Sequence, residues 1–189
     1  MFRSTLLALG VLTSPMAQAA EVPPAMSQYI YDDLMKWVND AQIVQAINAQ
    51  NNLTDGLTEA DIIARDEIWR AQLGADHSPL INEVVNAPLS TFLRDHMGNS
   101  AGRITEVFVM DHHGLNVASS GITSDYWQGD EAKFKQTYAK GAGSVFVDDI
   151  DLDESTQTYQ GQVSFAVTDP QTGVVIGAIT VGLNASTFF

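Results

Sequence analysis

The hydrophobic pattern of this chain changes its period at about residue 104. Before that point apolar residues recur every three or four positions, as in amphipathic helices; after it they form short runs or alternate with polar residues, as in strands. Helices in the first half and strands in the second predict an antiparallel sheet with helices packed mainly on one side. The expected fold class is therefore α+β.

The first half is expected to contain one long helix over residues 25–50 and a second helix over residues 58–73. Pro23 and Pro24 precede the long helix, where proline can begin a helix without interrupting it. The second helix opens on Thr58-Glu59-Ala60-Asp61, in which an acid follows a capping threonine by three positions. Two shorter helices are expected over residues 79–85 and 89–96.

The second half is expected to contain five strands. They are predicted over residues 104–110, 115–118, 144–150, 158–168 and 173–183. The first two form a hairpin with the turn Asp111-His112-His113-Gly114, and the last two are joined by the turn Asp169-Pro170-Gln171-Thr172-Gly173. A loop over residues 119–129 and a helix over residues 131–139 separate the second strand from the third.

Residues 1–20 have the pattern of a cleaved export signal. Arg3 provides a short positive region, and the apolar stretch Leu6–Leu12 is too short to span a bilayer. Ala17-Gln18-Ala19 offers the small residues that a signal peptidase accepts. We therefore expect residues 21–189 to form one periplasmic or secreted domain, with an uncleaved membrane anchor as the alternative.

The charge and the missing residue types exclude several functions. With 23 acidic and nine basic residues, the chain repels phosphate backbones, which disfavours nucleic acid and anionic membranes as partners. The absence of cysteine from the sequence excludes thiol catalysis, iron–sulfur clusters and zinc–thiolate sites. The sequence also lacks G-x-S-x-G, H-E-x-x-H and a glycine-rich phosphate loop. We expect neither an enzyme nor a cofactor.

Three segments of the second half are similar to a known family. They are ITEVFVMDHHGLNVASS at residues 104–120, TSDYWQGDEAKF at residues 123–134 and DESTQTYQGQVSFAVTDPQTGVVIGAITVG at residues 153–182. On these residues the chain resembles the Cache (PAS-like, PDC) extracytoplasmic sensor domains, in particular stand-alone periplasmic proteins with a single such domain. The resemblance extends from about residue 25 to the C-terminus.

This resemblance implies a PAS-like five-stranded antiparallel sheet, a long N-terminal helix, and a ligand cavity between the sheet and the segment that joins the second and third strands. The ligand-binding residues that it implies are Asp125, Tyr126, Trp127, Phe146, Gln162, Ser164 and Asp169. The ligand would be a small polar metabolite, such as a carboxylate, an amino acid or an amine. Because no transmembrane segment follows the last strand, the signal is expected to pass through a separate partner, such as a membrane-bound receptor or kinase.

Some patterns also allow a second interpretation. Tyr126 and Trp127 suit core packing as well as a ligand pocket. Asp111-His112-His113 contains metal-ligand residue types, although Asp111 is more typical of a residue that hydrogen-bonds its own turn. The acidic run over residues 148–154 lacks the central glycine of an EF-hand loop, so we expect a solvated connection, with weak calcium binding as the alternative. The long first helix is an alternative site for homodimerisation or docking without a ligand.

Overall fold

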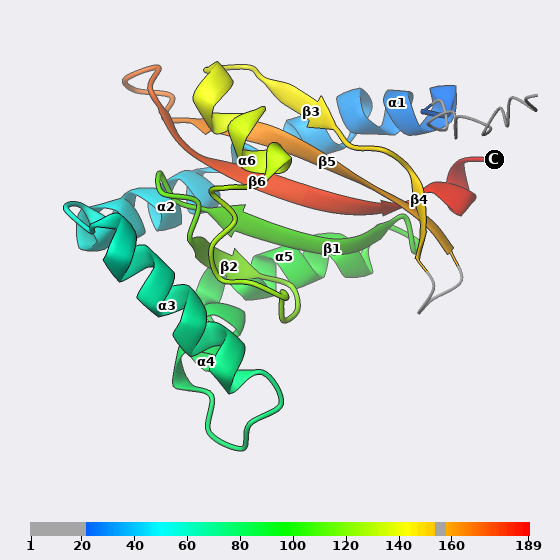
Figure 1. Ribbon diagram of the computed structural model, residues 1–189. Coiled ribbons are helices and arrows are strands. Elements are labelled where there is room, and N and C mark those ends of the chain that lie inside the picture. Colours follow the sequence, from blue (N-terminus) through cyan, green and yellow to red (C-terminus); the bar gives the residue numbers. More distant parts are fainter. Residues whose placement is uncertain (1–21, 154–157) are drawn as a thin grey trace, which may run out of the picture.

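The computed structural model describes residues 22–153 and 158–189 (Figure 1). The helices are α1 (Pro24–Asp32), η1 (Leu34–Lys36), α2 (Ala41–Thr54), α3 (Glu59–Gln72), α4 (Pro79–Val85), α5 (Pro88–Gly98), α6 (Ala132–Lys135), η2 (Tyr138–Lys140) and η3 (Ala185–Phe188), where η denotes a 3-10 helix. The strands are β1 (Ile104–Met110), β2 (Asn116–Ser119), β3 (Val145–Val147), β4 (Asp151–Asp153), β5 (Thr158–Thr168) and β6 (Val175–Asn184). The predicted export signal, residues 1–20, lies outside the described residues. Within the described ranges, no helix is both long and apolar enough to cross a membrane.

The N-terminal helical region is divided, which corrects the expectation of one continuous helix over residues 25–50. The short helix η1 follows α1, and α2 begins only after Asp40. The Asp40 side chain caps α2 by accepting a hydrogen bond from the backbone N–H of Gln42 at 2.8 Å. A capping aspartate favours the start of a new helix over continuation of the previous one.

Tertiary contacts hold this interruption in place. The Trp37 ring stacks on the ring of His96 in α5, with centroids 4.3 Å apart. The Asn39 side chain accepts a hydrogen bond from the backbone N–H of Thr168, the last residue of β5, at 3.0 Å. Both contacts come from the stretch between η1 and α2, so the break serves to attach the N-terminal region to α5 and to the sheet.

The strands form an antiparallel sheet in the order β2-β1-β6-β5-β3, and β4 adds a further pairing to β5. This order confirms the predicted five-stranded antiparallel sheet of an α+β fold. The strand expected over residues 144–150 is shorter than predicted, because β3 ends at Val147. The acidic run over residues 148–154, expected to be a solvated connection, contains the further strand β4, which pairs with β5. Helix α3 begins with the predicted capping box, because Thr58 and Asp61 exchange hydrogen bonds.

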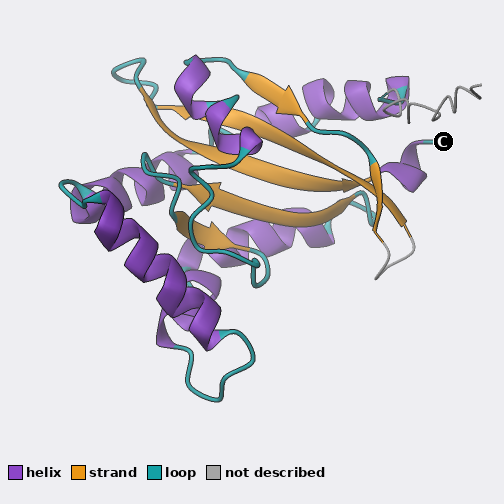
Figure 2. Cartoon of the chain, in the orientation of Figure 1, coloured by secondary structure: helices purple, strands orange, loops and turns teal. Residues whose placement is uncertain are grey.

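One face of the sheet is hydrophobic throughout and packs against α1, α2 and α5 (Figure 2). Its strand residues are Val107, Val109, Val163, Phe165, Ile179, Val181 and Leu183. Gly177 in β6 permits the close approach of α2: a Cβ atom there would collide with the carbonyl oxygen of Met110 and lie 3.1 Å from Cγ2 of Ile47. Helices α3 and α4 lie beside β2, outside this main core, and carry a second hydrophobic cluster that includes Trp69.

Candidate ligand-binding face

The opposite face of the sheet, which we call the polar face, carries the alternate residues of the same strands. Cross-strand pairing places Phe108, Thr180, Ser164 and Phe146 in one row across β1, β6, β5 and β3. The hydroxyl oxygens of Ser164 and Thr180 lie 2.9 Å apart, and both side chains are fully buried. Because burying hydroxyl groups is costly, their position in the middle of a sheet distinguishes this face from the hydrophobic one.

A second row joins Glu106, Gly182 and Gln162 across β1, β6 and β5. Gly182 has no side chain, so Nε2 of Gln162 reaches across it and donates a hydrogen bond to Oε1 of Glu106 at 2.8 Å. A Cβ atom at position 182 would lie only 2.6 Å from Cγ of Glu106. Glycine at this position therefore allows two polar side chains from non-adjacent strands to meet.

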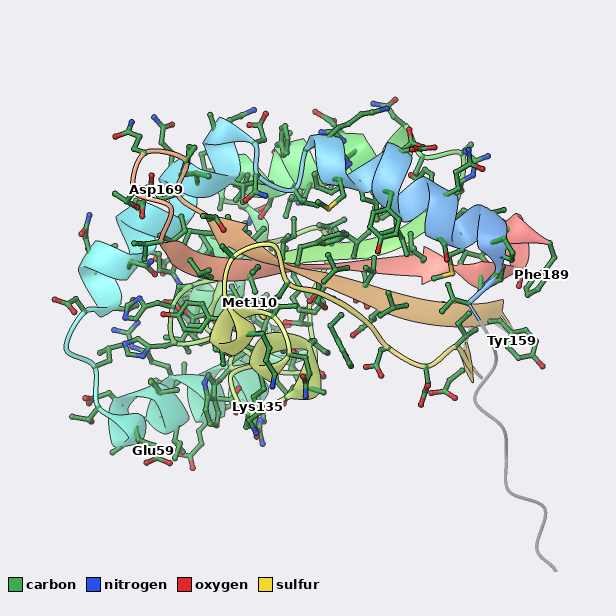
Figure 3. All side chains as sticks on the ribbon, turned by 90° about the horizontal axis from the view of Figure 1, so that it is seen from above. Glu59, Met110, Lys135, Tyr159, Asp169 and Phe189 are labelled. Atoms are coloured by element: carbon green, nitrogen blue, oxygen red, sulfur yellow. The ribbon has the colours of Figure 1, made fainter. Side chains whose placement is uncertain are left out.

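Part of the polar face is covered by α6 and η2. In Figure 3, α6, marked by Lys135, lies on the opposite side of the sheet from α1 and α2, close to Met110. Phe134 and Tyr138 stack with ring centroids 4.9 Å apart and pack onto the apolar end of the face, which includes Met110 and Ala178. The cover is thus hydrophobic at this end, and the polar rows lie toward the other end of the sheet.

Lys133 of α6 lies over this face. Its Nζ lies 5.4 Å from the centroid of the Phe108 ring and 2.9 Å from Oε2 of Glu131. The Lys133 side chain is only 13 % exposed. Its ammonium group is therefore balanced by a neighbouring carboxylate and by the face of an aromatic ring.

A cavity of about 260 Å³ lies at the edge of the polar face. It is lined by Met97 of α5, by Thr105 and Glu106 of β1, and by residues 119–123, which lead out of β2. The pairing of β1 with β6 is irregular between Ile104 and Glu106, and this bulge brings Thr105 and Glu106 together beside Gly182. Oγ1 of Thr105 is buried and has no hydrogen-bond partner among the described residues.

The segment that joins β2 to α6 is fastened to α3 by the carboxylate of Asp66. One oxygen of Asp66 accepts the backbone N–H groups of Tyr126 at 2.9 Å and Trp127 at 3.1 Å, and the other is paired with Arg70. Nε of Arg70 also lies 3.0 Å from Oδ1 of Asp125. Asp66 is 3 % exposed, so this buried carboxylate holds two consecutive residues of the loop directly, and its partner Arg70 holds the residue before them.

The Tyr126 ring packs against α3, with its centroid 5.5 Å from that of Trp69. It is 3 % exposed, and burial raises the pKa of its phenol to about 12. The indole N–H of Trp127 donates to the backbone oxygen of His113 at 2.9 Å. Both rings therefore contact protein groups on the α3 side of the loop and do not line the cavity beside Glu106.

The structure brings three of the seven predicted site residues together. Phe146, Gln162 and Ser164 share the polar face. Asp125, Tyr126 and Trp127 lie in the loop held by α3, at the other side of β2 from these three. Asp169 lies in the β5–β6 turn next to α2, where it accepts backbone N–H groups from Gln171 and Thr172 and bonds the side chain of Asn48 (Figure 3).

Sequence reasoning did not single out Thr105, Glu106 or Thr180. A signal for Glu106 was present, because a carboxylate interrupts an otherwise apolar strand. Its proximity to Gln162 depends on the pairing of β1 and β5 with β6, which the sequence pattern does not specify.

The segment Asp111-His112-His113-Gly114 forms a turn that the side chain of Asp111 stabilises. Oδ1 of Asp111 accepts the backbone N–H groups of His113 and Leu115, and its other oxygen accepts from Oγ1 of Thr54 in α2. Nδ1 of His112 lies 2.7 Å from Oδ1 of Asn51, and burial lowers the pKa of His112. No group of three or more His, Cys, Asp or Glu in the described part of the chain is arranged to hold a metal ion.

No protein-family model and no curated protein sequence matches this chain. Among solved structures, it is similar to the sensor domain of the V. cholerae histidine kinase DctB, with 16 % identity and a TM-score of 0.43 over 86 % of this chain and 53 % of that one. It is also similar to the ligand-binding domain of the Pseudomonas aeruginosa amino acid chemoreceptor PctC in complex with GABA, with 14 % identity and a TM-score of 0.42 over 86 % of this chain and 56 % of that one.

A third similar structure is the sensory domain of the Campylobacter jejuni chemoreceptor Tlp3 with isoleucine bound, with 13 % identity and a TM-score of 0.41 over 89 % of this chain and 66 % of that one. The chain thus spans between about half and two thirds of the length of these three proteins. These three solved structures are one sensor domain of a histidine kinase and two ligand-binding or sensory domains of chemoreceptors.

Proposed function

We propose that this chain is an extracytoplasmic sensor domain that binds a small polar molecule at the polar face of its sheet. The observation that supports this most is the difference between the two faces. One consists of aliphatic and aromatic side chains packed on helices, whereas the other carries the Ser164–Thr180 and Glu106–Gln162 pairs and a cavity at its edge. Ser164 and Thr180 are fully buried, and burying hydroxyl groups costs free energy, so their position favours a role for this face beyond core packing.

The arrangement favours binding over catalysis. A serine nucleophile needs a base within hydrogen-bond reach, and the partner of Ser164 is the hydroxyl of Thr180. Two of the four histidines lie in the β1–β2 turn against α2, and His96 lies against Trp37. The polar groups on this face can accept hydrogen bonds from a guest and donate them to it, and Ser164 is bonded to a hydroxyl group and not to a base.

A thermal-shift experiment on the purified protein tests this proposal. A panel of small carboxylates, amino acids, amines and polyols is added, and a compound present at a hundred times its Kd is expected to stabilise the fold by about 2.7 kcal/mol. For a domain of this size, that corresponds to a rise in Tm of roughly 5–10 °C. If no compound in the panel raises the Tm, the sensor proposal is wrong.

A double variant, Ser164→Ala with Thr180→Val, separates binding from folding. Removing both hydroxyl partners together leaves neither one unsatisfied, so the free protein is expected to remain folded with nearly unchanged stability. The stabilisation by any active compound is expected to fall. Equal stabilisation of the double variant and the parent protein would place the ligand elsewhere.

As the route of output, we propose that the ligand-bound domain acts on a separate membrane-bound receptor or kinase outside the cytoplasm. The supporting observation is the expected export signal at residues 1–20. Co-purification of the protein with solubilised membranes, with and without an active compound, tests this route. Unchanged recovery of membrane proteins in the two conditions would contradict it.

A second candidate function is self-association through the N-terminal region, and a groove between α2 and α5 supports it. Ala46, Ala49 and Leu53 line one side, Pro88 and Leu89 the other, and the Leu53 side chain is 81 % exposed. No charged residue lines this groove, in a chain of formal net charge −14. Two copies would repel each other least across such a neutral surface.

Light scattering tests this second function. The parent protein is expected to show a dimer that Leu53→Glu converts to a monomer, because the variant adds a charge to the neutral surface. An exposed position remote from the groove, such as Glu67→Lys in α3, provides the control. A monomeric parent protein at high concentration would contradict the proposal.

A further inference from the structure

The cavity beside Glu106 is lined by side-chain oxygens and, among the described residues, carries no side-chain nitrogen. The oxygens belong to Thr105, Glu106, Ser119, Ser120 and Thr123. The four hydroxyl groups can accept or donate a hydrogen bond, whereas the carboxylate of Glu106 and the sulfur of Met97 only accept. Because the one charged group of the lining is an acceptor, the cavity suits a guest that presents a donor to Glu106.

Glu106 gives this cavity a net negative charge. The other lining residues are neutral, and in the described part of the chain Glu106 makes no ion pair. One of its oxygens accepts from Gln162, which leaves the second available. Lys133, the basic group over the same face, is already paired with Glu131 and does not line the cavity.

Thr105 adds a hydroxyl group that lacks a partner. Its Oγ1 is buried, and among the described residues it makes no hydrogen bond. A buried hydroxyl left in this state costs about 1–3 kcal/mol. Thr105 lines the cavity next to Glu106, so a rotation of its side chain toward the cavity would let a guest bound to the carboxylate satisfy this hydroxyl group.

We propose that this cavity binds a small hydroxylated amine, with the protonated amino group on Glu106 and a hydroxyl group on Thr105. This assignment rests on the proposed sensor function and narrows its ligand to a cation. A volume of about 260 Å³ lies just below the range of roughly 300–1,000 Å³ typical for drug-sized ligands, so the amine is a compound of few heavy atoms. One carboxylate supplies too little charge for calcium, which takes six to eight oxygen ligands and usually several carboxylates.

Three compounds that share one carbon skeleton test whether the cavity prefers a positively charged ligand. They are 3-amino-1,2-propanediol, glycerol and glycerate, which carry an ammonium, a hydroxyl or a carboxylate group at the same end. Binding to the purified protein is measured by calorimetry and by thermal shift. The amine is expected to bind, glycerol to bind at least tenfold more weakly, and glycerate not to bind.

Glu106→Gln is the central variant, because glutamine keeps the shape of the side chain and an oxygen for Gln162. It is expected to weaken amine binding roughly tenfold to a hundredfold, the effect of losing a charge-assisted hydrogen bond. Glu67→Gln makes the same chemical change at an exposed position of α3 and is expected to bind the amine like the parent protein.

Thr105→Val tests whether the Thr105 hydroxyl serves the ligand, because a hydroxyl with a purely structural role would stabilise the free protein. It removes the unpartnered hydroxyl with little change of shape, so the free protein is expected to gain roughly 2–12 °C in Tm while amine binding weakens. A variant that loses stability instead would show that the hydroxyl is satisfied within the protein, and this would overturn the assignment of Thr105.

The outcomes distinguish the assignment from the broader function. If glycerate, or other acids of the panel, stabilise the protein and amines do not, the amine assignment is overturned while the sensor proposal stands. Equal amine binding by the parent protein and by Glu106→Gln would also overturn it. If no compound of any class binds, both proposals fail.

Discussion

Replacing Asp66 by alanine is expected to release the loop that joins β2 to α6 from helix α3. In the native protein one oxygen of this buried carboxylate accepts the backbone N–H groups of Tyr126 and Trp127, and the other pairs with Arg70. Alanine removes the acceptor and supplies nothing in its place. Two backbone donors in a largely buried segment would then lack a partner.

The expected magnitude follows from these contacts. Each buried donor left without an acceptor costs about 1–3 kcal/mol, so the two together cost roughly 2–6 kcal/mol. The ion pair adds little, because the Arg70 side chain is 59 % exposed. In a domain of this size, the Tm is expected to fall by roughly 4–24 °C.

Urea denaturation followed by tryptophan fluorescence measures this loss, and near-UV circular dichroism reports the stacking of Trp69 on Tyr126. Glu67→Ala, an exposed substitution one residue along the same helix, is the matched control and should cost less than about 0.5 kcal/mol. Asp66→Asn retains an acceptor oxygen and is expected to fall between the two. A loss for Asp66→Ala as small as that of the control would refute the view that this carboxylate holds the loop.

Three further substitutions address other parts of the structure. The phenol of Tyr126 has a pKa of about 12 in the folded protein and about 10 when unfolded. The contribution of the neutral phenol to folding stability is therefore complete below pH 10 and is lost as the pH rises toward 12. Tyr126→Phe should flatten the fall of Tm over that interval, and an unchanged fall would contradict this. Gly177→Ala forces a Cβ atom onto the backbone of Met110 and should prevent folding to a soluble product, as judged by circular dichroism. Burial lowers the pKa of His112, so the contribution of its neutral imidazole to folding stability is present above about pH 6.5 and is lost on acidification. His112→Gln should therefore make the Tm less sensitive to acid.

The helices and strands that local pattern determines were predictable from the sequence. The capping residues Thr58 and Asp61 define the start of α3 without help from the rest of the chain. The period of two in β1, β5 and β6 separates the side chains that enter the hydrophobic core from those of the polar face. For the same reason Gln162 and Ser164, two positions apart in one strand, could be predicted to share a face.

Features that depend on long-range contacts were not predictable in this way. The break between α1 and α2 is held by Trp37 on α5 and by Asn39 on the end of β5, residues far away in the sequence. The ring of Tyr126 packs on α3 because Asp66 and Trp69, about 60 residues earlier, supply an acceptor and an apolar surface there. A tyrosine ring with a polar tip suits either a hydrophobic core or a ligand pocket, so the residue type alone does not decide between them.

By itself, then, the sequence determined the α+β class, the approximate extent of α3, α4, α5, β1, β2, β5 and β6, and which residues of a strand lie on the same side, since these follow from the periods of helix and strand. Only the tertiary structure decided which strands are neighbours. The order β1-β6-β5 places Glu106 and Gln162 on either side of Gly182, and the bulge at Thr105 leaves a cavity beside them. Such a cluster is a property of register between distant strands, and register is set when the hydrophobic face packs against its helices.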